Sequence, residues 1–83
     1  MKNDRNLQIQ DIVSVYTNRF TCASMCDTTE QEERECAAAN TWLKAQIAAN
    51  GITKEELKEA FDACEKRAKS QGNAFSYDTD MLK

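Results

Sequence analysis

A shortage of turn-forming residues constrains this chain more than any other feature of its sequence. Its 83 residues contain no proline and only two glycines, Gly51 and Gly72. Small β-rich domains usually need many turns, which depend on glycine, proline and asparagine. Hydrophobic residues make up 41% of the chain, which is too apolar for a disordered segment. The sequence therefore predicts a single, small, all-α domain.

An apolar stripe at helical spacing predicts the first helix over residues 6–26. A β-strand over residues 9–16 is the alternative, because β-branched residues are frequent there. Period-two alternation fails at Ile12-Val13 and the stripe continues beyond this segment, so the helix is favoured. The stripe consists of Ile9, Ile12, Val13, Tyr16, Phe20 and Ala23.

Capping signals place the second helix between a pair of threonines and a glycine. Thr28 and Thr29 each have a glutamine or a glutamate three residues later, so either could open the helix with a capping box. The dipeptide Asn50-Gly51 is typical of the left-handed turn that ends a helix. We therefore expect the second helix to run from this threonine pair to about Ala49.

The third helix has the clearest start in the sequence. Thr53 and Glu56 form the pattern of a capping box, and Ile52 and Leu57 occupy the two positions of a hydrophobic staple. Basic residues collect towards Gly72, where we expect the helix to end. Its apolar stripe consists of Leu57, Ala60, Phe61, Cys64 and Ala68.

Short connections between successive helices favour antiparallel neighbours, so the expected architecture is an up-down-up three-helix bundle. Residues 1–72 form this three-helix domain. Residues 73–83 show no sustained apolar period and are expected to form a flexible C-terminal tail. The alternative is an open arrangement that becomes compact only as a homodimer, because the core of so short a chain is small.

The charge balance argues against nucleic acid and membranes as partners. The net charge is −3, with 11 basic and 14 acidic residues. Phosphate backbones and anionic lipids attract basic surfaces, so we expect direct binding to neither. The N-terminus leads into no apolar run that would form a signal peptide or a membrane span. We therefore expect a cytoplasmic protein whose cysteines are thiols.

The cysteines are the only candidates for metal or redox chemistry, because the chain contains no histidine. Of Cys22, Cys26, Cys36 and Cys64, only the first two have the short spacing that is typical of zinc sites. A helical hairpin turning near Gly51 would place Cys36 and Cys64 about level. A disulfide or redox pair and a zinc module are therefore alternatives to our main expectation of separate buried thiols, with no metal or cofactor.

No motif in the sequence indicates catalysis. A nucleophile paired with a base and a glycine-rich phosphate loop are both missing, and the carboxylates lie along helix faces, where charges are usually solvated. We therefore expect that the chain is not an enzyme.

The connection between the second and third helices resembles a DNA-binding turn. Residues 46–57, with the sequence QIAANGITKEEL, are similar to the turn of a helix-turn-helix and to the connector of H-NS-like nucleoid proteins. The resemblance implies a small DNA-associated regulator that acts on transcription or on the nucleoid and binds as a dimer. Glu55, Glu56 and Glu59 would then face phosphates and oppose binding. A well-capped helical hairpin accounts for the same residues.

Trp42 lies outside the main stripe of the second helix. It is about 100° around the helix from Leu43, among Ala38, Ala45 and Ala49. In a three-helix bundle the middle helix needs a broad apolar arc, so Trp42 fills the core in one interpretation. In the other it anchors an interface on a floor of alanines.

Binding to a protein is the function that remains. We expect a small acidic protein-binding module that regulates or inhibits a larger complex, which could be one that handles nucleic acid and presents a basic groove. Small acidic helical proteins of this kind are often phage- or plasmid-borne accessory factors. The candidate contact residues are Trp42, the acidic residues Glu30, Glu32, Glu33 and Glu35, and Phe75 and Tyr77 of the tail.

Overall fold

The computed structural model describes residues 2–82 and contains three α-helices and one short 3-10 helix. Helix α1 spans Lys2–Ala23, α2 spans Thr29–Asn50, α3 spans Lys54–Ser70, and the 3-10 helix η1 spans Thr79–Leu82. No strand occurs over this range, so the predicted all-α fold is confirmed. None of the helices described is long and apolar enough to cross a membrane.

The capping signals of the sequence form the helix ends that they predict. The Thr28 hydroxyl accepts a hydrogen bond from the Gln31 N–H at 3.1 Å, so Thr28 is the N-cap of α2. Gly51 ends this helix in the left-handed conformation, with φ of 59°. At α3 both bonds of the capping box are present, because Glu56 N–H donates to Thr53 Oγ1 and Thr53 N–H donates to Glu56 Oε1.

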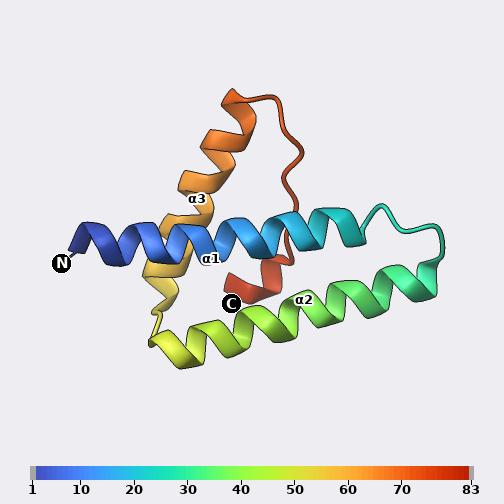
Figure 1. Ribbon diagram of the computed structural model, residues 1–83, viewed down its shortest axis with the longest axis horizontal. Coiled ribbons are helices and arrows are strands. Elements are labelled where there is room, and N and C mark those ends of the chain that lie inside the picture. Colours follow the sequence, from blue (N-terminus) through green and yellow to red (C-terminus); the bar gives the residue numbers. More distant parts are fainter. Residues whose placement is uncertain (1, 83) are drawn as a thin grey trace.

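The first two helices form an antiparallel pair, and the third crosses it (Figure 1). Both α2 and α3 pack against α1, so α1 is the central element of the bundle. The predicted three-helix bundle is confirmed. However, α3 crosses α1 steeply and does not run parallel to it, as an up-down-up arrangement would require. The buried core draws on all three helices and consists of Ile9, Val13, Tyr16, Ala39, Leu43, Ile52, Leu57, Ala60, Phe61 and Cys64.

The C-terminal segment packs against the bundle, although the sequence predicts a flexible tail. The Tyr77 ring stacks on Phe61 with 4.3 Å between ring centroids. Asp78 joins a ring of hydrogen bonds: its N–H donates to the Tyr16 oxygen at 3.2 Å, Tyr16 donates to Asn40 Oδ1 at 2.6 Å, and Asn40 donates back to Asp78 Oδ2 at 2.9 Å. The segment thus ties α1 and α2 together and covers part of the core.

Candidate functional site

Trp42 lies at the border between the core and the exposed face of α2. It is half-buried and packs against the core, so part of its ring fills the bundle. The guanidinium carbon of Arg19, on α1, lies 5.8 Å from the centre of the Trp42 ring. This separation is within the range of a cation–π interaction. Trp42 therefore combines the two environments that the sequence leaves as alternatives.

Small side chains surround Trp42 on the outer side of α2. Ala38 and Ala45 lie one helical turn before and after it, and both are exposed. Arg19 is also exposed, and it reaches the tryptophan from the neighbouring helix. We call Trp42, Arg19, Ala38 and Ala45 the Trp42 surface. Gln46, four residues after Trp42, is the larger neighbour on this side of α2 and is half-buried. The exposed neighbours Ala38 and Ala45 leave room for a partner beside the indole.

A hollow of about 310 Å³ adjoins this surface between α1 and α2. It shares Arg19 with the Trp42 surface and extends to the last residues of α1 and the first turns of α2. Its lining joins small and apolar groups to one carboxylate and one guanidinium. The residues that line it are Arg19, Cys22, Ala23, Cys26, Gln31 and Glu35.

Arg19 was not predicted as a site residue. The sequence gives no clear signal for this contact, because counting equally from the two ends of the loop between α1 and α2 places Arg19 opposite Glu33, well before Trp42. Charged residues are usually assigned to solvent when a helix is considered alone. The contact becomes visible only when the two helices are paired.

The four glutamates of α2 do not form one group. Glu30, Glu33 and Glu35 are exposed and Glu32 is half-buried, so they lie on different faces of the helix. Glu30 accepts a weak ion pair from Arg34 at 3.7 Å, one turn further on. Only Glu35 lines the hollow beside the Trp42 surface. Of the four glutamates predicted to contact a partner, Glu35 is thus the one that lies beside the Trp42 surface.

Phe75 and Tyr77 make contacts within the molecule. Both are half-buried, their ring centroids are 5.5 Å apart, and Tyr77 also stacks on Phe61. The structure does not bring them together with the hollow beside the Trp42 surface, because neither residue lines that hollow. Their aromatic rings stabilise the attachment of the C-terminal segment.

The four cysteines are free thiols that differ in burial. Cys64 is buried, and its thiol donates to the Gln10 carbonyl oxygen at 3.5 Å. Burial raises the pKa of both the Cys64 and the Cys36 thiol, and for Cys36 the negative charge of Glu32 adds to this effect. Such thiols are neutral and weakly reactive at neutral pH. Cys22 is exposed and Cys26 half-buried, so the expectation of buried thiols is correct in full only for Cys64.

The paired arrangement of Cys36 and Cys64, the predicted alternative, is not formed. The crossing of α3 turns Cys64 towards Gln10 of α1, whereas the charges that act on Cys36 come from Glu32, Cys26 and the C-terminal segment. Across residues 2–82, no group of three or more cysteine, aspartate or glutamate side chains is placed to hold a metal ion.

The largest electrostatic perturbation in the described chain belongs to a structural contact. Hydrogen bonds from Arg5 and from the Thr53 backbone lower the pKa of Glu56 from 4.5 to about 2. Burial raises the pKa of Tyr16, whose hydroxyl is part of the bonds that hold the C-terminal segment. Both groups hold elements of the fold together.

Comparison with known protein families, with curated proteins and with solved structures gave no match in any of the three.

Proposed function

We propose that this chain is a small acidic protein-binding module that regulates or inhibits a larger complex, and that the Trp42 surface is its main contact. The observation that carries the proposal is the placement of Trp42: a half-buried indole with Arg19 on one side and the exposed alanines Ala38 and Ala45 one turn before and after it. Tryptophan and arginine are the residues most enriched among those that dominate binding energy.

The contact with Arg19 favours binding because it orients the indole before the partner arrives. A side chain that is already fixed loses little conformational entropy on association. The core contacts of Trp42 restrict it further. Arg19 retains N–H donors that can meet acceptors of the partner, since a guanidinium offers five of them. The Trp42 surface thus supplies an apolar anchor and a polar contact side by side.

The charge of the molecule indicates the kind of partner. The net charge is −3, Glu35 lines the hollow, and Glu30 and Glu33 are exposed on other parts of the first turns of α2. Opposite charges on two surfaces accelerate their encounter, and salt weakens this effect. A basic protein surface, such as the groove of a complex that handles nucleic acid, fits this chemistry.

Trp42→Ala tests the proposal. Proteins retained from native lysate by the immobilised wild-type chain are identified, and the affinity of the purified partner is measured. Trp42→Ala should weaken binding at least about tenfold, since aromatic anchors commonly contribute more than about 2 kcal/mol. Because Trp42 also packs on the core, its loss lowers the melting temperature as well, so a second variant is needed.

Arg19→Gln separates binding from stability, because Arg19 is exposed and lies outside the core. It should weaken binding several-fold without a large change in melting temperature. Lys44→Gln is the matched control: it removes the same charge from an exposed position of α2 that does not line the hollow. If both substitutions weaken partner binding equally, Arg19 contributes only through the net charge of the chain and not through a specific contact. Unchanged binding by Trp42→Ala would contradict the proposal.

A further inference from the structure

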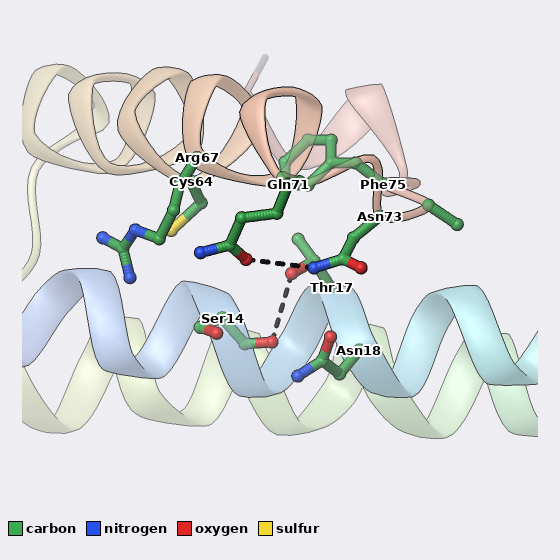
Figure 2. Close-up of a pocket in the computed structure, with 10 residues that line it drawn as sticks. Ser14, Thr17, Asn18, Cys64, Arg67, Gln71, Asn73 and Phe75 are labelled. Carbon is green, nitrogen blue, oxygen red and sulfur yellow. Dashed lines mark hydrogen bonds between the residues drawn. The ribbon is translucent and has the colours of Figure 1, made fainter.

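A second cavity lies on the other side of α1, between this helix and the end of α3. Its volume is about 280 Å³. Figure 2 shows α1 and α3 as its two walls and the chain after α3 closing one end. Three segments that are far apart in the sequence therefore meet here. The lining consists of Ser14, Thr17, Asn18, Cys64, Arg67, Ala68, Gln71, Asn73, Ala74 and Phe75.

The turn at Gly72 creates the closed end of the cavity. Gly72 has φ of 70°, in the left-handed region that glycine adopts readily. The N–H of Asn73 donates to the Ala68 carbonyl oxygen at 2.9 Å, which reverses the chain directly after α3. Asn73 and Phe75 are thereby brought over the Ser14–Asn18 stretch of α1. The cavity is a consequence of this helix end.

The electrostatic character of the lining is opposite to that of the whole molecule. The chain has a net charge of −3, yet Arg67 is the only charged residue among those that line the cavity, and no carboxylate is present. The charge of Arg67 also acts on the buried thiol of Cys64, whose pKa it lowers against the larger opposing effect of burial. Asp11, which is not part of the lining, raises the pKa of the same thiol by a smaller amount. An anion would therefore meet the positive charge of Arg67 in the lining and a weaker negative charge from Asp11 outside it.

Hydrogen-bond donors gather at one end of the cavity. Arg67 is held in place because it donates to Gln10 Oε1 at 2.8 Å. The Gln71 oxygen accepts from Asn73 Nδ2 at 3.0 Å, which leaves the Gln71 amide nitrogen on the side of Arg67. Figure 2 shows this nitrogen, the guanidinium and the Ser14 hydroxyl facing the same space between α1 and α3. Arginine and amide N–H groups are the kinds of donor that bind the two oxygens of a carboxylate.

The rest of the lining mixes polar and hydrocarbon groups, and Asn18 and Asn73 contribute amides to it. Phe75, Ala68 and Ala74 contribute hydrocarbon surface, and the buried residues Thr17 and Cys64 form a floor. A volume of about 280 Å³ is just below the range of sites for drug-sized ligands, so the occupant is small. Its carbon skeleton would lie against the phenyl ring while its charged end meets Arg67.

We propose that this cavity is a binding site for a carboxylate carried on a small apolar body. The carboxylate accepts from the Arg67 guanidinium, the Gln71 amide and the Ser14 hydroxyl, and the body packs against Phe75. Two sources share this chemistry: a free organic acid, and an acidic side chain of another protein. The site is separate from the Trp42 surface and does not depend on the function proposed for it.

Titration of the ¹⁵N-labelled chain with sodium benzoate, followed by the backbone amide signals, tests the site. Benzoate should shift the signals of the lining residues saturably, with a Kd of about 1 mM, as expected for a small ligand with one charged contact. Benzamide has the same shape without the charge and should bind at least about tenfold more weakly. Blocked glutamate, titrated in parallel, distinguishes the sources: tighter binding than benzoate indicates a protein side chain, and weaker binding a free acid.

Two substitutions separate the site from general electrostatics. Arg67→Gln should weaken benzoate binding at least about tenfold, whereas Lys66→Gln removes the same charge from an exposed neighbour outside the lining and should change it less than about twofold. Ser14→Ala should weaken it several-fold without disturbing the helix. Equal binding of benzoate and benzamide, equal effects of Arg67→Gln and Lys66→Gln, or no saturation up to about 50 mM would each overturn the proposal.

Discussion

At the scale of single residues, Phe61 has the central place in the core. It is 1% exposed, meets Tyr16 edge-on with 6.0 Å between ring centroids, and stacks on Tyr77. Phe61→Ala leaves a cavity among these rings and should cost about 3 kcal/mol of unfolding free energy. Urea denaturation followed by far-UV circular dichroism measures the loss.

Phe75→Ala is the matched control for this prediction. Phe75 is half-buried and lies at the margin of the core, so the same truncation should cost clearly less. If Phe61→Ala lowers the unfolding free energy no more than Phe75→Ala does, Phe61 does not occupy the centre of the core.

The sequence predicts residues inside one helix better than contacts between helices. Helical spacing predicts the stripe Leu57, Ala60, Phe61, Cys64 and Ala68; the first four are buried and Ala68 is half-buried. The environment of Trp42 is set by Arg19 on another helix, so spacing along α2 leaves it open. The cavity beside Arg67 could not be predicted from the sequence either, because its lining comes from three separate segments.

At the scale of elements, Glu56 connects all three helices. Its carboxylate caps α3 through Thr53 and accepts two bonds from Arg5 of α1, at 2.7 and 3.1 Å. Arg5 also donates to the carbonyl oxygens of Asn50 and Gly51, at the end of α2. One ion pair thus fixes the end of α2, the start of α3 and the first turns of α1.

The lowered pKa of Glu56 predicts how stability depends on pH. Since its pKa falls from 4.5 to about 2 on folding, the carboxylate stabilises the fold above pH 4.5, and this contribution is lost as the pH falls towards 2. Glu56→Gln should therefore lower the melting temperature at pH 7, and the difference from wild type should shrink between pH 4.5 and 2. Melting curves across this range measure it. Glu59→Gln, at an exposed position of the same helix, is the control; a Glu56 difference independent of pH would contradict the assignment.

The helix ends could be predicted where a side chain makes the cap. Thr53, Glu56 and Gly51 act as the sequence predicts, because these signals are local and chemically specific. Helix α1 runs over Lys2–Ala23, whereas residues 6–26 were expected. Its ends carry neither a capping box nor a glycine or proline stop, so the apolar stripe alone defines them poorly.

At the scale of the whole molecule, the direction of α3 and the path of the C-terminal segment could not be predicted. Short connections favour antiparallel neighbours, but the crossing angle depends on how side-chain ridges fit between α1 and α3. The segment after Gly72 has no helical period, and its apolar residues are spaced irregularly. Their positions follow from the surface that α1 and α3 leave open, so they become interpretable only once the bundle exists.

The C-terminal segment should therefore belong to the same cooperative unit as the helices. Deleting residues 75–83 removes the stacking of Tyr77 on Phe61 and the bond from Asp78 to Tyr16, and it exposes core surface. We expect the unfolding free energy to fall by about 3 kcal/mol or more, because several large side chains lose burial. The slope of free energy against urea concentration should fall too, because less surface becomes exposed on unfolding.

The variant Tyr77→Ala shows how much of the lost unfolding free energy comes from the Tyr77 ring and how much from the rest of the segment. It removes the stack on Phe61 but retains Asp78, Asn40 and Tyr16, so it should cause only part of the loss. A deletion that leaves both the melting temperature and the urea slope unchanged would show that the segment is not part of the folded unit. Phe75 and Tyr77 would then be available to a partner, and the contact surface would extend beyond Trp42. A deletion that lowers both quantities assigns these rings to stability and leaves the half-buried Trp42 as the aromatic anchor.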